Sequence, residues 1–272
     1  MNDLGTGDAT AVIGSPRRSE LGLIVKMPAP ATAEVAGYVG FDMVLLDSEH
    51  GASDMSELEN HIRATESAGI RAMVRVSDCA SADILRALDA GAKGVVVPHI
   101  KSATELEQAV AAALYPPMGQ RGLAVTTRAG RHGTRSVRDH IAAATRDTEL
   151  IAQIEDAEGL DHLDEILEVE GLSGIFIGPM DLSASLGYPG ETNHPEVRSS
   201  VDAVVDAVLR RRDVRLLTLA QDENEASEWI NRGASLVLVS APALVAKRLA
   251  GFASSFGERL GDLVATPKDL SQ

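Results

Sequence analysis

The sequence predicts a (β/α)8 barrel, the TIM-barrel fold of the α/β class, from three observations. Eight short apolar runs alternate with longer amphipathic stretches over about 250 residues. Each run is continuous and rich in Val, Ile and Leu, which is typical of a parallel strand buried on both faces. Glycines such as Gly69, Gly91 and Gly171 stand where the intervening helices should end. A doubly wound open sheet is the competing architecture, but the glycine-rich turn that normally follows its first strand is missing after residue 25.

The elements follow from the chain in order. Residues 1–20 are rich in Gly, Ser and Thr without an apolar period, so we expect an N-terminal extension there. Residues 21–272 are expected to form a single barrel domain with a C-terminal helical segment. The predicted strands are 21–25, 43–46, 72–76, 94–97, 150–154, 174–177, 214–219 and 236–239. The predicted helices include 56–68, 80–90, 102–114, 161–169, 195–211 and 224–232.

One interval, between the fourth and fifth strands, is too long for a plain βα unit. It contains a predicted helix, the run Tyr115-Pro116-Pro117-Met118-Gly119 and then an arginine-rich passage. The arginines of this passage are Arg121, Arg128, Arg131, Arg135, Arg138 and Arg146. Two interpretations remain open: a solvated surface excursion, or a cationic loop over the active-site mouth that attracts an anionic substrate.

Composition excludes several classes of protein. The 272 residues carry a formal net charge of −15 and only 3% aromatic residues, which argues against a nucleic-acid-binding surface. Cys79 is the single cysteine, so the chain cannot form an internal disulfide or a thiolate metal site. There is no run of 18 apolar residues and no basic-then-apolar leader, so we expect a cytoplasmic protein with no membrane span.

Polar residues cluster where the predicted strands end, and in a barrel these ends converge on one mouth. The strand-end groups are Asp47-Ser48-Glu49-His50-Gly51, Arg75, Pro98-His99, Gln153-Ile154-Glu155-Asp156, Gly178-Pro179-Met180-Asp181 and Gln221. Each has a structural alternative when taken alone, since Asp181 could cap a helix and His50 could be a structural histidine. The combination of acids, a histidine and an arginine at one end indicates catalysis.

These residue types suit a hard divalent ion. Glu155 and Asp181, with Gln153 nearby, offer oxygen ligands and leave positions open for a chelating substrate such as a 2-oxo acid. Arg75 would stabilise negative charge on the oxo oxygen, and His50, oriented by Asp47, would move protons. A Schiff-base mechanism is the weaker alternative, because Lys26 is the only lysine placed suitably at a strand end.

The sequence also resembles the HpcH/HpaI aldolase family, the class II metal-dependent pyruvate aldolases related to the citrate lyase β subunit. The resemblance covers roughly residues 21–245 and rests on six motifs in series. They are LLDSEHG (45–51), MVRV (73–76), LDAGAKGVVVPHI (88–100), YPPMGQRGL (115–123), IAQIED (151–156) and GIFIGPMDLSASLGYPG (174–190).

This resemblance implies an activity and a site. The reaction would be reversible cleavage of a 4-hydroxy-2-oxo acid to pyruvate, or a related 2-oxo acid, and an aldehyde through a metal-bound enolate. By this resemblance, Glu155 and Asp181 would bind Mg²⁺, Mn²⁺ or Co²⁺, and Arg75 would contact the enolate oxygen. His50 would be the catalytic histidine, with Asp47 as its partner. The substrate would be bound by Gln153, Gly178, Pro179 and Met180. The backbone amides of Met180 and Asp181 would receive the pyruvate carboxylate.

The resemblance further implies a homo-oligomer, a hexamer built as a trimer of dimers with exchanged C-terminal helices. Asp89 would reach the active site of a neighbouring subunit. The sequence departs from the family pattern at Met180, Ile24, Ser240 and Pro242, which bears on the identity of the aldehyde and on how the last loop closes the site.

Two other functions remain open. One is a lyase of the citryl- or malyl-CoA type on the same barrel, with the arginine-rich passage binding the CoA phosphates. The other is a barrel that binds a small acid without turning it over.

Overall fold

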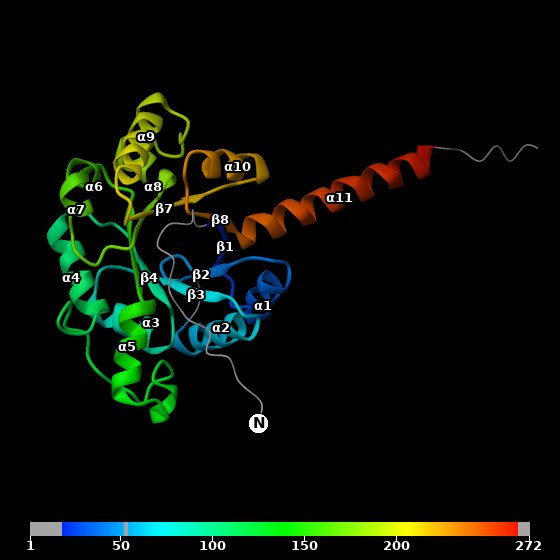
Figure 1. Ribbon diagram of the computed structural model, residues 1–272. Coiled ribbons are helices and arrows are strands. Elements are labelled where there is room, and N and C mark those ends of the chain that lie inside the picture. Colours follow the sequence, from blue (N-terminus) through cyan, green and yellow to red (C-terminus); the bar gives the residue numbers. More distant parts are fainter. Residues whose placement is uncertain (1–17, 52–53, 266–272) are drawn as a thin grey trace, which may run out of the picture.

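The computed structural model describes residues 18–51 and 54–265, and its centre is a closed barrel of eight parallel strands (Figure 1). The strands pair in chain order, and β8 closes the barrel on β1. They are β1 (Glu20–Val25), β2 (Met43–Asp47), β3 (Arg71–Arg75), β4 (Gly94–Val97), β5 (Glu149–Ile154), β6 (Gly174–Ile177), β7 (Arg215–Leu219) and β8 (Leu236–Ser240). The (β/α)8 prediction is confirmed, and each strand boundary lies within one residue of its predicted place.

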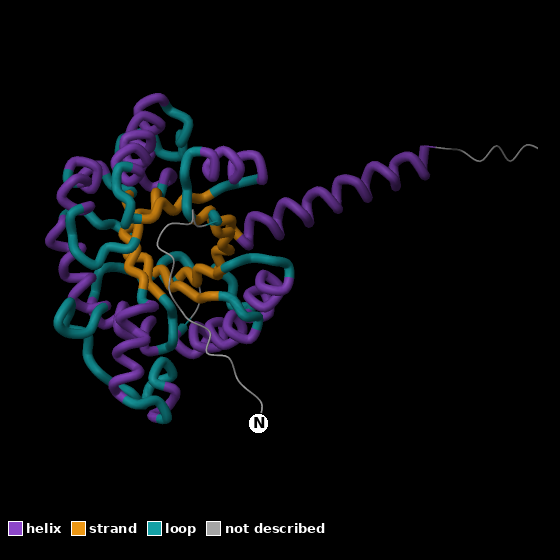
Figure 2. The backbone as a smooth tube through the Cα atoms, viewed as in Figure 1, coloured by secondary structure: helices purple, strands orange, loops and turns teal. Residues whose placement is uncertain are grey.

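Helices surround the ring of strands (Figure 2). The first of them are α1 (Pro30–Tyr38), α2 (Met55–Ser67), α3 (Ser81–Asp89), α4 (Ala103–Ala113), the short 3₁₀ helix η1 (Arg131–Gly133) and α5 (Val137–Asp147). The others are α6 (Ala157–Asp161), α7 (Leu163–Leu167), α8 (Pro179–Ser185), α9 (Pro195–Leu209), α10 (Glu223–Asn231) and α11 (Ala241–Ala265). The helix predicted at 161–169 is instead two short helices, because the backbone leaves the helical conformation at His162.

The core has two layers, which explains the continuous apolar runs in the sequence. In β2, for example, Met43 and Leu45 belong to the cluster inside the barrel, while Val44 and Leu46 pack outward beneath the helices. Gly22 makes room for the inner layer, since a Cβ atom at this position would lie 2.5 Å from the Leu238 side chain. Both faces of each strand are therefore buried, as in other parallel barrels.

The amino end of the barrel is closed by a network of ion pairs. Arg71 lies 2.7 Å from Glu20 and 3.0 Å from Glu149, and Arg215 pairs with the same two acids. The four residues begin β1, β3, β5 and β7, so they form one layer contributed by alternate strands. Two arginines and two glutamates balance one another here.

The longest helix, α11, projects away from the barrel (Figure 1). Its large apolar side chains are exposed along its length: Leu244, Val245, Leu249, Phe252 and Phe256. Within the described residues, no helix combines the length and apolarity needed to cross a bilayer. The predicted extension lies almost wholly outside the described residues, and β1 begins at Glu20, inside its predicted boundary.

Candidate active site

A cavity of about 580 Å³ opens at the carboxyl ends of the strands, and most of the predicted site residues line it. Those that line it are His50, Arg75, Gln153, Gly178, Pro179, Met180 and Asp181. Glu155 lies directly beside this lining, because a Cβ atom on Gly178 would stand 2.6 Å from Glu155 Oε2. The structure therefore brings the residues of four different strand ends to one place, as the barrel rule predicts.

Asp47 and Arg75 form a buried, two-point ion pair at the base of this cavity. Arg75 Nε donates to Asp47 Oδ1 at 3.0 Å, and Nη2 donates to Oδ2 at 2.5 Å. The two residues face each other across the register of β2 and β3. Burial disfavours the charged carboxylate, but the hydrogen bonds and charge of Arg75 hold the pKa of Asp47 below its ordinary value. Arg75 is consequently fixed in orientation, with Nη1 reaching toward Gln153 Oε1 at 3.4 Å.

The expected pairing of Asp47 with the His50 ring is not what the structure shows. Asp47 Oδ1 accepts hydrogen bonds from the backbone amides of Glu49 and His50, each at 3.2 Å. The pairing fails because both carboxylate oxygens are already held by Arg75, and Lys26 Nζ also lies 3.4 Å from Oδ2. Asp47 therefore orients the backbone that carries His50, while the imidazole faces the cavity.

The His50 ring is accessible from the cavity. Its side chain is 52% exposed, and the closest described carboxylate atom is Glu49 Oε2, 3.8 Å from Nε2. Among the described residues, no hydrogen bond to this ring occurs. A substrate in the cavity could therefore reach an imidazole nitrogen directly.

Three further groups form a compact cluster beside the cavity: Glu49, His99 and Glu155. Each offers one ligand atom, and these atoms lie within 4.8 Å of one another. The His99 amide donates to Glu155 Oε1 at 3.0 Å, and its ring lies 3.0 Å from Asp156 Oδ2 and 3.2 Å from Glu49 Oε1. His99 adopts a left-handed backbone, with φ +55°, which costs stability and is often found at functional sites.

The electrostatics of this cluster favour a bound cation. Burial raises the pKa of Glu155 to about 7, although hydrogen bonds from the His99 amide and the Gln153 side chain favour the carboxylate. Burial alone would lower the pKa of His99, but its bond to Asp156 and the nearby acids raise it above the ordinary value. Glu49 Oε2 is buried without a hydrogen bond among the described residues, although it lies 3.1 Å from Nη1 of Arg75, whose guanidinium also pairs with Asp47. The residues present fit a divalent ion, because acidic oxygens outnumber the cations that neutralise them.

Asp181 occupies a different place from the cluster. It lies exposed in the first turn of α8 and lines the same cavity, but it is not a member of the three-residue group. Met180, 57% exposed beside it, narrows the rim of the cavity. The geometry therefore offers two carboxylate sources for a cation: the buried Glu155 cluster and the exposed Asp181.

Glu49 and His99 were absent from the site inferred by resemblance, although both were found by the strand-end rule. Arg198, from α9, and Trp229, from α10, also line the cavity. The sequence did not predict that these two residues line the cavity, because the strand-end rule does not apply to residues on helices.

Asp89 and the arginine-rich passage lie outside this cavity. Asp89 ends α3 and accepts a hydrogen bond from Arg121 at 2.8 Å. The hypothesis that the passage covers the chain's own mouth is wrong for the described residues, because none of its arginines lines the cavity. The reason is topological: α4 ends, and β5 begins, at the amino end of the barrel, so the passage starts and finishes there.

Comparison with known proteins agrees with this geometry. Residues 20–241 match the family described as HpcH/HpaI aldolase/citrate lyase. The chain belongs to this family. It is 36% identical to a 2-keto-3-deoxy-L-rhamnonate aldolase of Salmonella dublin, over 81% of this chain and 82% of the relative. It is also 36% identical to a pyruvate aldolase of Rhizobium etli, over 88% and 93% of the two chains.

A solved structure extends the likeness to three dimensions. A HpcH/HpaI aldolase/citrate lyase family protein from Burkholderia cenocepacia superposes with a TM-score of 0.82 at 30% identity, covering 89% of this chain and 95% of the other. Together with the site geometry, these similarities make this family member a carbon–carbon lyase of the aldolase type.

Proposed function

We propose that this enzyme reversibly cleaves a 4-hydroxy-2-oxo acid to pyruvate, or a closely related 2-oxo acid, and an aldehyde. The observation that carries the proposal is that a fixed guanidinium and an accessible imidazole line one cavity and that a surplus of buried carboxylate lies directly beside it. The names of the two aldolase relatives support the same substrate class. Aldol chemistry needs a base for one proton and positive charge beside the 2-oxo group, and this cavity offers both.

A divalent cation, Mg²⁺, Mn²⁺ or Co²⁺, would be held by Glu155 and Asp181, with Glu49 and His99 beside it. When bound, the ion supplies Lewis-acid polarisation of the 2-oxo group. Glu155 suits this role because it is buried and anchored by the His99 amide and by Gln153. The acid cluster would lose its mutual repulsion when a cation is present, which favours binding.

Arg75 and the segment after β6 would bind the acid end of the substrate. Two hydrogen bonds to Asp47 orient Arg75, so its guanidinium can stabilise negative charge on the 2-oxo oxygen without reorganising. Gln153 lies beside it, and the first-turn amides of Met180 and Asp181 would receive the carboxylate. Gly178 and Pro179 shape this wall of the cavity.

His50 would take the proton from the 4-hydroxyl group of the substrate during cleavage and return it during synthesis. Its accessible ring and its anchored backbone suit that role. The lysine alternative is weaker, because the Lys26 ammonium group lies 3.4 Å from the Asp47 carboxylate. Schiff-base formation would need to break that ion pair and release the amine.

The test is a cleavage and condensation screen with the full-length enzyme. Pyruvate release from 4-hydroxy-2-oxo acids should require Mg²⁺, Mn²⁺ or Co²⁺, should stop with a chelator and should disappear in Glu155→Ala. Citryl-CoA and malyl-CoA serve as comparison substrates. Preferential cleavage of a CoA thioester, or substrate binding without turnover under every metal condition, would contradict the proposal.

We further propose a homo-oligomer in which α11 packs on a neighbouring subunit, in the hexameric arrangement that the resemblance implies. The exposed apolar side chains of α11, with the Phe252 and Phe256 rings 6.5 Å apart, support this. In such an assembly Asp89 would reach a neighbour's cavity. Light scattering after chromatography checks it, since Phe252→Glu with Phe256→Glu should reduce the mass. The expected cytoplasmic location stays a prediction.

A further inference from the structure

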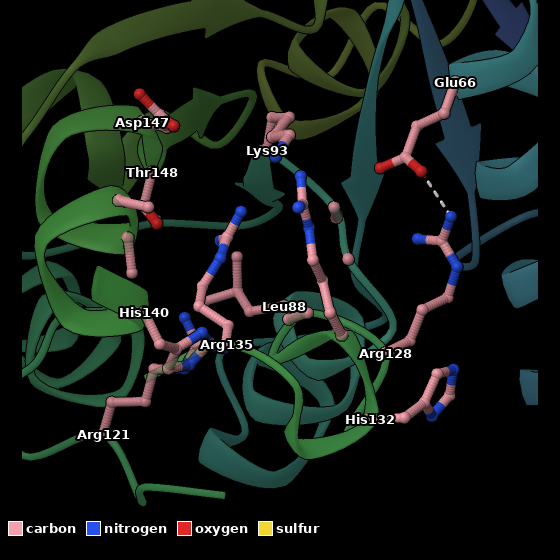
Figure 3. Close-up of a pocket in the computed structure, with 16 residues that line it drawn as sticks. Glu66, Leu88, Lys93, Arg121, Arg128, His132, Arg135, His140, Asp147 and Thr148 are labelled. Atoms are coloured by element: carbon pink, nitrogen blue, oxygen red, sulfur yellow. Dashed lines mark hydrogen bonds and ion pairs between the residues drawn. The ribbon is translucent and has the colours of Figure 1, made fainter. Parts of the chain in front are cut away.

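A second cavity, of about 420 Å³, lies on the flank of the barrel. Figure 3 shows the side chains that line it. It is walled by the ends of α2 and α3, the arginine-rich passage and α5. Lys93 and Thr148, which line it, directly precede β4 and β5, so the cavity opens near the amino end of the barrel. No lining residue is shared with the catalytic cavity.

The lining carries a marked excess of positive charge in a chain whose net charge is −15. Its cationic residues are Lys93, Arg121, Arg128, Arg131 and Arg135, against the two carboxylates Glu66 and Asp147. Both carboxylates are already engaged, Glu66 by Arg128 and Asp147 by Arg146. The cavity therefore holds more cations than its own acids can neutralise.

Three of these cations have no ion pair with any described carboxylate: Lys93, Arg131 and Arg135. Figure 3 shows Arg135 and Lys93 pointing into the same space, while Arg128 turns aside to Glu66. Like charges gathered this way repel one another unless an anion lies between them. Arg131 and His132 also adopt left-handed backbone, with φ +54° and +53°, which is uncommon for two successive residues other than glycine.

A buried polar atom in the same wall is also unpartnered. Arg121 is 6% exposed, and its Nε has no hydrogen-bond acceptor among the described residues. His140 lies in the same wall, 2% exposed, with its Nε2 2.9 Å from Tyr115 Oη. A buried donor without an acceptor is costly, so native structures seldom leave one unless a ligand or water completes it.

We propose that this flank cavity is a binding site for a phosphate monoester, distinct from the catalytic cavity of the same chain. Guanidinium forks and a lysine ammonium group are the side chains that recognise a doubly charged phosphate. The cavity is larger than a phosphate group, and Leu88, Ala143 and Ala144 provide apolar wall for an attached organic body. A single carboxylate would leave more of the cationic charge uncompensated.

The experiment is calorimetric titration of the full-length, Mg²⁺-loaded enzyme with glucose 6-phosphate, with glucose and inorganic phosphate as comparison probes. The test variant is Arg131→Gln with Arg135→Gln, which removes two unpaired cations. The matched control is Arg138→Gln with Arg212→Gln, which removes the same charge from two exposed arginines outside the cavity. A charge-matched control separates a site from general electrostatic attraction.

We expect saturable binding of glucose 6-phosphate below ~10 mM, weaker binding of inorganic phosphate and none of glucose. The test variant should lose about tenfold or more in affinity, as two charge-assisted hydrogen bonds disappear, and the control should stay within about twofold. The absence of saturable binding, or an equal loss in both variants, would overturn the site.

A second measurement locates the ligand. Burial and the charges of Arg121 and Arg135 lower the pKa of His140, so a bound phosphate beside them should raise it, observable by NMR of the ring protons. An unchanged His140 titration at saturating glucose 6-phosphate would place the ligand elsewhere and overturn the assignment. Metal-dependent proton exchange of pyruvate should stay within about twofold in the test variant, which keeps this result independent of the proposed aldolase activity.

Discussion

The two ends of the barrel carry similar charged residues, but the acids are neutralised at the amino end and in excess at the carboxyl end. Glu149 begins β5 and Glu155 follows its end, yet Glu149 lies in a closed network with two arginines while Glu155 lies among other acids. Likewise β3 begins with Arg71 and ends with Arg75. In the amino-end network of Glu20, Arg71, Glu149 and Arg215, every charge has a protein partner. At the carboxyl end Arg75 is shared between Asp47 and Glu49, and His99 lies among Glu49, Glu155 and Asp156, so four carboxylates depend mainly on one guanidinium and one imidazole.

The comparison explains why we assign a structural role to Glu149 and propose a functional role for Glu155, which follows the same strand. Paired charges at a barrel end stabilise the fold and need no bound ion to balance them. A buried surplus of carboxylate destabilises the chain until a proton or a cation arrives, and such groups mark functional sites. β3 and β5 each have a structural residue at the amino end and a proposed functional residue at the carboxyl end. Matched substitutions at the two ends can therefore separate the two roles.

The largest difference is expected between Glu155→Gln and Glu149→Gln. Glu155→Gln should reduce metal-dependent turnover by about 10³-fold or more, because an anionic ligand is lost from the cation site. Glu149→Gln should leave turnover within about twofold and lower the free energy of unfolding by about 1–2 kcal/mol, since Arg71 and Arg215 lose one of their two acidic partners. Kinetics and urea denaturation measure the two effects. Equal loss of turnover in both variants would contradict the comparison.

His50→Ala should come next, with turnover reduced by about 10²–10³-fold through loss of the proton-transfer group. Manganese affinity, followed by electron paramagnetic resonance, should stay nearly unchanged because the ring lies outside the acid cluster. An unchanged rate in this variant would remove His50 from the mechanism. A rate lost together with metal affinity would instead assign it to the metal site.

Arg75→Lys tests the fixed guanidinium and should lower kcat by about 10²-fold, because a lysine cannot make the two-point contact with Asp47. Arg71→Lys, at the other end of the same strand, is the matched control. Its kcat should stay within about twofold, with only a modest fall in thermal stability. If both variants keep full activity, the Asp47–Arg75 pair is structural like its counterpart.

Gly178→Ala should have the smallest effect of these substitutions, because it changes only the position of Glu155 and removes no functional group. The added methyl group would stand 2.6 Å from Glu155 Oε2 and 2.9 Å from its Cβ, so Glu155 must move. Metal affinity should fall by about tenfold, as is common when the support of a ligand is disturbed. Gly122→Ala meets only ordinary contact, 3.8 Å from Leu85, and should leave affinity unchanged. Calorimetric titration with Mn²⁺ decides between them.

The strands and the composition of the mouth could be predicted from sequence because both depend on simple regularities. A parallel strand buried on both faces reads as a continuous apolar run, and the carboxyl ends of such strands must meet at one edge. The sequence alone therefore predicts that Glu49, His99 and Glu155 lie at one mouth.

The pairing within the mouth could not be predicted in the same way. Asp47 binds Arg75 because the register of β2 and β3 sets them opposite each other, and the sequence does not give that register. The direction of the arginine-rich passage depends on how the chain turns after α4. The projection of α11 could not be predicted either, because its exposed apolar side chains pack on no described part of the barrel.

The most direct test is exchange of the methyl protons of pyruvate for deuterium, followed by NMR with Mn²⁺, with Mg²⁺ and with a chelator. It needs no knowledge of the aldehyde, because removal of a methyl proton is the step that the acid cluster and Arg75 should assist. We predict exchange in wild type and Glu149→Gln that requires the metal, and none above background in Glu155→Gln. Metal-independent exchange, or none with any metal in the wild-type enzyme, would contradict the assignment of the carboxylate surplus to catalysis.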